Sequence, residues 1–363
     1  MKASAAVIRE PGGQFLIEEV ELDDLRKDEV LIRVEACGVC HTDVVAQSMI
    51  ELPGVFGHEG VGVVEATGSA VQWAKPGDRV VAAYPSCGCC SNCHDGAPYI
   101  CEHTMAIGFG GARADQSKTI KLDGKPISSA FFQQSTFASH AITIERNLVP
   151  VAKDIASELL AAIPCGIQTG AGSVANSLGV KPMSSLAVFG TGAVGLSAIM
   201  MAKVIGVNPI IAVDVNPDRL ELALELGAHH IINAMDGDVT KQLLEICPKG
   251  LNYSFETSAN EQALNDAIAC LGMGGRCGIV TSPHMGEKYP FSPSELMFRG
   301  ASLEGIIQGA AIPRTFLPKL LKLNKQGLFP YERLIKNYDF VDINQAFADS
   351  KSGHVIKPVL KMS

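Results

Sequence analysis

The chain has 363 residues, of which 47% are hydrophobic and 19% are charged, and its formal net charge at pH 7 is -8. This is the composition of a globular protein that is long enough for two domains with separate cores. A negative net charge with no run of like charges argues against a nucleic-acid partner, because binding phosphates needs a basic surface.

The first 150 residues are predicted to form an irregular, mostly antiparallel β domain. They are rich in Gly, Val and Pro and contain alternating runs such as EVLIRVEACG (29–38) and GVGVVEATG (60–68). The opening stretch 1–13 indicates a strand and a turn instead of a secretion signal, so we expect a cytoplasmic protein. The polar, turn-rich segment 112–134 is predicted to be a surface excursion.

One set of chemically active side chains lies in three separate stretches of the chain. These are Cys40 in CGVCHTD, His58 and Glu59 in GHEGVG, and Cys165 in PCGIQTG. Two cysteines and one histidine, far apart in sequence, form the three-ligand pattern of a catalytic zinc whose fourth position takes water or substrate. Each residue alone also has a plainer interpretation, as a small buried thiol or a core histidine.

The loop CGCCSNCHDGAPYIC (87–101) holds five of the eleven cysteines. The spacing C-x2-C-x2-C-x7-C is formed by Cys87, Cys90, Cys93 and Cys101. Four thiolates at this spacing can close a tetrahedron around a structural zinc ion, and Cys89 is interpreted as a bystander. Disulfides would leave one cysteine over and require an oxidising compartment, whereas an iron–sulfur cluster also accepts four cysteines.

From about residue 150 to 305, strand-like and helical runs alternate, which is the βαβ rhythm of a parallel sheet. The uncharged stretch Ser184–Ala202 is predicted to be a strand, a turn and a buried helix, and we expect no membrane span.

The stretch VFGTGAVG (188–195) indicates a strand that enters a dinucleotide-binding turn and then a helix. Gly190 would permit the tight turn, Gly192 would allow a pyrophosphate to approach, and Gly195 would let helix and strand pack closely. Asp214 follows nineteen residues after Gly195, at the end of the next strand. Its carboxylate can accept the hydroxyls of an adenosine ribose and repel a 2′-phosphate, which favours NAD over NADP. The alternative is a glycine turn of any α/β protein, with Asp214 as a helix cap.

These motifs together resemble the zinc-dependent medium-chain alcohol dehydrogenases over nearly the whole chain. The motifs GHEGVGVV, the four-cysteine loop, CGIQTGAG and FGTGAVG occur in the order of that family, and STFASHA (135–141) makes the chain most similar to aryl-alcohol (benzyl alcohol) dehydrogenases. The resemblance implies a GroES-like catalytic domain, split into residues 1–166 and 307–363, around a Rossmann coenzyme domain at 167–306. It also implies a homo-oligomer, dimeric or tetrameric.

The resemblance further implies two zinc ions per chain and reversible oxidation of a primary alcohol, aromatic or allylic, to the aldehyde with NAD. Hydride would leave the alkoxide on zinc for the nicotinamide. The catalytic ion would be held by Cys40, His58 and Cys165, with Glu59 behind it. Asp43 would orient the His58 imidazole, and Thr42 would receive the alcohol proton.

The coenzyme contacts implied by the resemblance extend beyond the glycine turn. The pyrophosphate is matched by His41 and Lys357, for which plain surface charges are the alternative, and the nicotinamide by Thr169. The remaining residues that we expect to bind coenzyme are Gly190, Gly192, Ala193, Val194, Gly195, Asp214 and Arg219.

Two departures from the family concern the substrate and the proton. Only 17 residues separate Cys40 from His58, and Val45 occupies a position that is histidine in several relatives. The pocket is expected to have a small residue at Ala83 and apolar walls or core from Phe131, Phe132 and Phe137. The competing functions are a zinc-free reductase of double bonds on the same fold and a non-catalytic zinc or redox-sensing protein.

Overall fold

The computed structural model describes residues 1–281 and 288–362 and divides into two compact units. Unit 1 comprises Met1–Cys165, Ile312–Lys319 and Glu332–Ser363, and unit 2 comprises Gly166–Ala311 and Leu320–Tyr331. The division differs from the expected domains at Gly166, 307–311 and Leu320–Tyr331, all of which belong to unit 2. Helix α11 (Pro313–Lys325) begins in unit 1 and ends in unit 2, which no sequence pattern indicates.

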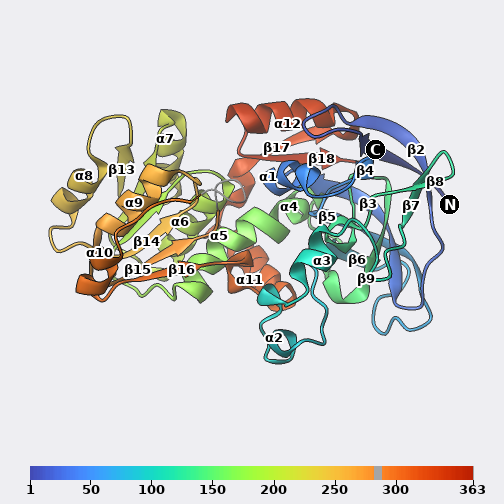
Figure 1. Cartoon of the computed structure of the whole chain (residues 1–363), viewed down its shortest axis with the longest axis horizontal. Coiled ribbons are helices and arrows are strands. Elements are labelled where there is room, and N and C mark those ends of the chain that lie inside the picture. The colour runs from blue at the N-terminus through green and yellow to red at the C-terminus, as the bar shows by residue number, and fades with distance from the viewer. Residues whose placement is uncertain (282–287, 363) are drawn as a thin grey trace. The chain divides into compact units, whose positions relative to one another are not determined.

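Unit 1 is built on two largely antiparallel sheets. One has the order β4 (Gly54–Val55), β1 (Lys2–Ile8), β2 (Leu16–Leu22), β7 (Ile120–Leu122), β8 (Lys125–Ile127). The other has the order β10 (Leu148–Pro150), β6 (Arg79–Ala82), β5 (Gly60–Thr67), β3 (Glu29–Gly38), β18 (Lys357–Lys361), β17 (Ile335–Asp339), and β9 (His140–Ile144) also pairs with β3. Because β18 pairs antiparallel with β3, the end of the chain lies in the same sheet as β3 (Figure 1).

Short helices connect these strands, and two of the seven candidate zinc ligands, Cys93 and Cys165, lie within them. They are α1 (His41–Val45), η1 (Ala46–Ser48), α2 (Ser91–His94), η2 (Pro98–Ile100), α3 (Thr104–Phe109), η3 (Phe131–Gln133), η4 (Glu145–Asn147), α4 (Ser157–Ala162), the π-helical turn η5 (Ile163–Ile167), η8 (Tyr331–Leu334), η9 (Phe340–Asp342) and α12 (Ile343–Ser352).

The prediction of a surface excursion at 112–134 holds only for 114–116 and 123–126, which are exposed. The segment forms β7, β8 and η3, and Phe131 and Phe132 are 1% and 6% exposed. Buried polar groups of the segment are paired inside the protein, as Ser129 Oγ shows by accepting hydrogen bonds from the backbone N–H groups of Thr119 and Ile120 at 2.9 and 3.2 Å. The polar composition of this segment therefore does not mean that its residues are all exposed, because buried polar side chains form hydrogen bonds with neighbouring backbone groups.

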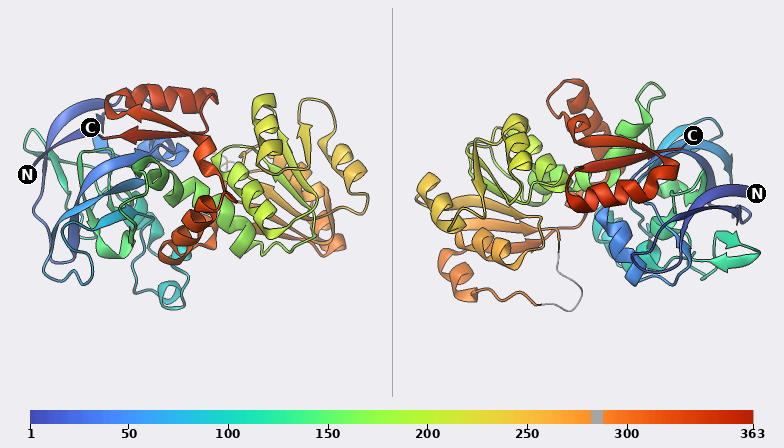
Figure 2. Two further views of the ribbon diagram at one scale, coloured as in Figure 1. Left: turned by 180° about the vertical axis from the view of Figure 1, so that it is seen from behind. Right: turned by 90° about the horizontal axis from the view of Figure 1, so that it is seen from above.

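Unit 2 is a parallel sheet with helices. Its strand order is β13 (His230–Asn233), β12 (Ile210–Asp214), β11 (Leu186–Phe189), β14 (Leu251–Glu256), β15 (Leu271–Ile279), β16 (Ser302–Gly305), and every neighbouring pair is parallel. Numbered along the unit, this is the order 3-2-1-4-5-6 of the doubly wound dinucleotide-binding fold. The two views of Figure 2 show the strands side by side with helices around them.

The remaining helices of unit 2 are α5 (Gln168–Gly172), the π-helical turn η6 (Ser173–Ser177), α6 (Ala193–Ile205), α7 (Pro217–Leu226), α8 (Val239–Ile246), α9 (Glu261–Ala269), α10 (Pro293–Arg299) and η7 (Gln308–Ala310). The uncharged stretch Ser184–Ala202 holds β11 and most of α6, both buried. Across residues 1–281 and 288–362, no helix has the length and apolarity needed to cross a membrane.

Candidate active site

Cys40, His58 and Cys165 come together in unit 1 although they lie far apart in sequence. Cys40 precedes α1, His58 precedes β5, and Cys165 follows α4. The Sγ atoms of Cys40 and Cys165 are 3.8 Å apart, and His58 Nε2 is 3.3 Å from Cys165 Sγ. A tetrahedral zinc with Zn–S bonds of about 2.3 Å places its sulfurs about 3.8 Å apart, so the donor set fits that ion.

The Asp43 carboxylate orients His58 within this set. Asp43 is 0% exposed, and its Oδ1 lies 3.0 Å from His58 Nδ1. The same carboxylate accepts hydrogen bonds from the backbone N–H groups of Gly57 and Cys40, each at 3.1 Å. Because Nδ1 faces the carboxylate, Nε2 is turned toward the sulfurs, which is how buried carboxylates hold metal-binding histidines. Although burial disfavours the imidazolium, Asp43 raises the pKa of His58 well above its usual value.

Glu59 lies beside the three ligands and is paired with Lys357. One carboxylate oxygen of Glu59 lies within 4.8 Å of the three donor atoms. Its Oε2 contacts Lys357 Nζ, which also donates a hydrogen bond of 3.1 Å to the Val39 carbonyl. Burial raises the pKa of Glu59 to about 7, against the opposing effect of the Lys357 charge. Gly38 makes room for this carboxylate, because a Cβ there would clash with Glu59 Oε2.

Lys357 is 2% exposed, so the alternative of a plain surface charge at this position is wrong. Sequence reasoning missed the Glu59–Lys357 pair altogether. The two residues are brought together only when β18 pairs with β3, and neither residue's local sequence signals that pairing.

Aromatic rings surround the imidazole of His58. The ring centroids of Phe132 and Phe131 lie 4.7 and 5.5 Å from that of His58, and Phe109 packs on both phenylalanines at 5.3 and 5.8 Å. Phe137, by contrast, packs on Phe15 at 5.9 Å as part of the core. Phe131, Phe132 and Phe137 belong to one buried core cluster, with Phe109 of α3 packed against it, and Phe131 and Phe132 are the two that contact His58.

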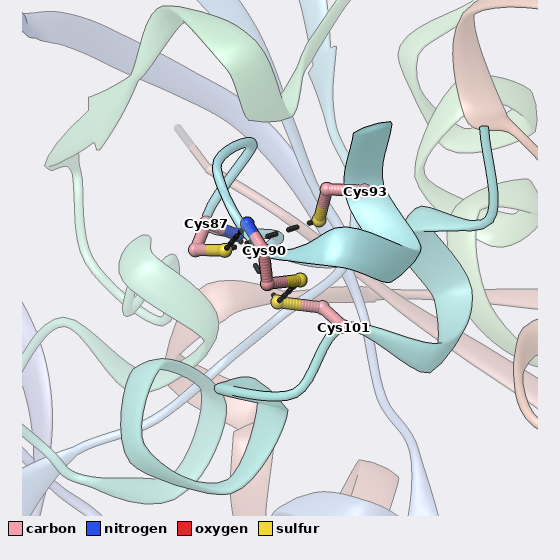
Figure 3. Close-up of side chains that lie close together, drawn as sticks. All are labelled: Cys87, Cys90, Cys93 and Cys101. Carbon is pink, nitrogen blue, oxygen red and sulfur yellow. Dashed lines mark hydrogen bonds between the residues drawn. The ribbon is translucent and has the colours of Figure 1, made fainter. Parts of the chain in front are cut away.

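The four-cysteine loop gathers its sulfurs in one place (Figure 3). The Sγ atoms of Cys87 and Cys93 are 3.9 Å apart, as are those of Cys90 and Cys101. These separations suit four thiolates around one zinc ion, with no position left for substrate. Although burial opposes ionisation, backbone N–H groups of Cys89 and Cys90 lower the pKa of Cys87 to about 5. All eleven cysteines, each in the described part of the chain, are free thiols, and Cys89 is exposed.

The glycine turn of unit 2 joins β11 to α6. Gly190 has φ of 88°, a left-handed conformation that favours glycine. A Cβ at Gly195 would clash with the Gly190 carbonyl, whereas the Cβ position of Gly192 is open. Ala193 and Val194 begin α6, so their backbone N–H groups lie in the first turn, where phosphates bind.

Asp214 ends β12 and is held by four hydrogen bonds from the protein. Its Oδ2 accepts from the N–H and the hydroxyl of Thr191 at 2.5 and 2.7 Å, and its Oδ1 accepts from the N–H groups of Val215 and Asn216 at 2.7 and 2.9 Å. The alternative of Asp214 as a helix cap is wrong, since Asn216 caps α7 with its own side chain. Arg219, half-buried, follows in the first turn of α7.

The remaining residues that the sequence singles out are divided between the two units. In unit 1, His41 is exposed at the start of α1, and Thr42 Oγ1 lies 3.6 Å from Cys40 Sγ. Val45 ends α1 with 40% of its surface exposed. In unit 2, Thr169 lies in α5, and its carbonyl accepts a hydrogen bond of 2.7 Å from Ser173 Oγ.

Comparison with known proteins gives matches along the full length of the chain. Residues 26–151 match the alcohol dehydrogenase GroES-like domain, and residues 193–325 match the zinc-binding dehydrogenase family. A geraniol dehydrogenase of Castellaniella defragrans is 42% identical, with 99% of this chain and 98% of that protein covered.

Solved structures give the same result. The crystal structure of an alcohol dehydrogenase zinc-binding domain protein from Burkholderia ambifaria is 45% identical with a TM-score of 0.97, over 100% of this chain and 99% of that one. Benzyl alcohol dehydrogenase from Acinetobacter calcoaceticus is 39% identical with a TM-score of 0.96, and both chains are covered completely.

Proposed function

The chain belongs to the zinc-dependent medium-chain alcohol dehydrogenases, an oxidoreductase family, and from this we propose that it converts aromatic or allylic primary alcohols reversibly to aldehydes with NAD. The observation that carries the proposal is the convergence of Cys40, His58 and Cys165, with Asp43 fixing the imidazole. We propose two zinc ions per chain, one in this set and one among the four cysteines of the loop 87–101.

The chain's own side chains would divide the work at the first of these sites. Cys40, His58 and Cys165 would hold the ion, which when bound polarises the alcohol oxygen and favours loss of its proton. Thr42 can take and pass on that proton, because a hydroxyl both donates and accepts. Val45 cannot continue the relay, but its partial exposure lets water replace the missing histidine.

The substrate class is supported by the rings around His58 and by the names of relatives. Phe109, Phe131 and Phe132 form a rigid apolar wall beside the ligand set, and Ala83 adds little bulk. Flat conjugated substrates suit such a wall, since rings pack well on rings. One relative is named geraniol dehydrogenase and another benzyl alcohol dehydrogenase.

We therefore expect kcat/KM with NAD to be higher for benzyl-type and geranyl-type alcohols than for ethanol or secondary alcohols, by about 10-fold or more. A panel of alcohols and aldehydes, followed by NADH absorbance, tests this. A higher value for ethanol would contradict the substrate class alone. No turnover of any alcohol, or full activity after complete removal of zinc, would contradict the dehydrogenase itself and favour a sensor or a zinc-free reductase.

The preference for NAD is proposed from Asp214, whose carboxylate would accept the adenosine ribose hydroxyls and repel a 2′-phosphate. We expect Asp214→Gly to lower the ratio of kcat/KM for NAD to that for NADP by about 10-fold or more, because both the acceptor and the repulsion are lost. Steady-state kinetics with both coenzymes measures the ratio. A wild-type protein that uses NADP as efficiently as NAD would contradict the assignment.

We also propose a cytoplasmic homo-oligomer, dimeric or tetrameric. Free thiols throughout the chain suit a reducing compartment. Strand β16 ends the order of the parallel sheet, and nearby α10 exposes Met297 and Phe298 at 67% and 76%. A sheet edge and apolar side chains of this kind are features that a second copy of the chain can cover.

A further inference from the structure

The hydroxyl of Thr191 is directed at Asp214 from within the glycine turn. Its Oγ1 donates a 2.7 Å hydrogen bond to Asp214 Oδ2, and the backbone N–H of the same residue donates to the same oxygen at 2.5 Å. Thr191 is 0% exposed, so water does not compete for this bond. The side chain between Gly190 and Gly192 is therefore not merely a spacer in the glycine motif.

The carboxylate of Asp214 is clamped on both sides. Its Oδ1 accepts from the N–H groups of Val215 and Asn216 at 2.7 and 2.9 Å, while Thr191 serves Oδ2. Four donors of the protein reach this carboxylate, two at each oxygen, so a ribose hydroxyl would share an oxygen with them. Three of the donors are backbone groups that every sequence would supply. Only the Thr191 hydroxyl is a side-chain donor, which depends on the type of residue at that position.

We infer that Thr191 is a positioning residue that holds Asp214 in place for the adenosine ribose and so strengthens the preference for NAD over NADP. The inference rests on the proposed function, in which Asp214 accepts the ribose hydroxyls. Without the hydroxyl, Oδ2 keeps only the backbone N–H, and the carboxylate gains freedom to turn about its Cβ–Cγ bond. That freedom must be lost again when the ribose binds, which weakens NAD binding. A coenzyme with a 2′-phosphate donates fewer hydrogen bonds to the Asp214 carboxylate, so its dissociation constant should change less.

Thr257 offers a matched control in the same turn. Its hydroxyl donates to the carbonyls of Phe189 and Gly190 at 2.9 and 3.1 Å, on the chain just before Thr191. The four hydrogen bonds to Asp214 do not involve it. Thr257→Val removes a threonine hydroxyl from the glycine turn, as Thr191→Val does, but leaves the carboxylate clamp intact. Any general loosening of the turn acts on the shared pyrophosphate site and weakens both coenzymes alike.

The test is the dissociation constant of NADH and of NADPH, from the fluorescence of each reduced coenzyme, for wild type, Thr191→Val, Thr191→Ser, Thr191→Ala and Thr257→Val. We expect Thr191→Val to raise the NADH constant about 3- to 10-fold and the NADPH constant less than about 2-fold, as for the loss of one hydrogen bond. Thr191→Ser retains the hydroxyl and should keep the wild-type ratio, and Thr257→Val should change both constants by the same factor.

A ratio of NADH to NADPH affinity that is unchanged in Thr191→Val, or a Thr191→Ser variant that behaves like it, would overturn the positioning role while leaving the proposed function intact. If Thr191→Val melts below the assay temperature, the comparison of Thr191→Ala with Thr191→Ser decides in the same way. A wild-type protein that binds NADPH as tightly as NADH would overturn the role of Asp214, and the inference with it.

Discussion

Cys165→Ser is expected to lower kcat/KM for a benzyl-type alcohol by about 10³-fold or more while the protein stays folded. The Cys165 sulfur lies 3.8 Å from Cys40 Sγ and 3.3 Å from His58 Nε2, so it closes the ligand set. A serine hydroxyl is a far weaker zinc ligand than a thiolate, and metal assistance is worth several kcal/mol of activation free energy. Steady-state kinetics, zinc analysis and a thermal melt measure the three consequences.

Cys93→Ser makes the same chemical change in the other sulfur group and is the matched control. Cys93 Sγ lies 3.9 Å from Cys87 Sγ in a set that leaves no room for substrate. Loss of a structural zinc removes folding free energy directly, so we expect a lower melting temperature and one zinc fewer per chain. Equal losses of activity and of melting temperature in the two variants would contradict separate roles. A Cys93→Ser variant as stable as wild type would contradict a structural site.

The sequence supported the prediction of the four-cysteine group and the dinucleotide turn because each depends on local spacing. Only two residues lie between Cys87 and Cys90 in the loop, so little folding is needed to bring their sulfurs together. The glycine turn likewise depends on neighbours, and Gly190 has the positive φ that its motif predicts. The catalytic set is not local, and its prediction depended on a family resemblance, since Cys40 and Cys165 are separated by most of unit 1.

What the sequence could not predict are contacts that pair distant strands or lie inside a motif. Lys357 meets Glu59 only because β18 joins the sheet beside β3. Thr191 occupies a position that the glycine motif leaves open, so no rule of spacing indicated its bond to Asp214. The burial of Phe132 was hidden by polar neighbours whose hydrogen bonds are satisfied within the fold.

The second prediction with a large expected effect concerns the contribution of the buried Glu59–Lys357 pair to stability. Lys357→Met is expected to lower the free energy of unfolding by about 3–5 kcal/mol at a pH well above the pKa of Glu59, where its carboxylate is ionised and is left buried without its partner. The side chains of Lys357 and Glu59 are 3% and 0% exposed, so water cannot replace the lost ammonium. Urea unfolding of the zinc-loaded protein measures the change. Lys361→Met, at the exposed far end of the same strand, should stay within about 0.5 kcal/mol of wild type.

The double variant Lys357→Met with Glu59→Gln separates the charge from the packing. If the uncompensated carboxylate causes the loss, a neutral amide at Glu59 should restore part of the stability, and the two substitutions will not be additive. A double variant as unstable as the sum of the two single variants would show instead that the lysine acts through its packing. The charge argument has a further consequence at the ligand set. Two thiolates and one imidazole would leave a bound Zn²⁺ neutral, and Glu59 with Lys357 is neutral as well. Where Glu59 is ionised, removing the lysine alone leaves one net negative charge within reach of the ion, so Lys357→Met should also lower activity, and Glu59→Gln should reverse that part of the loss.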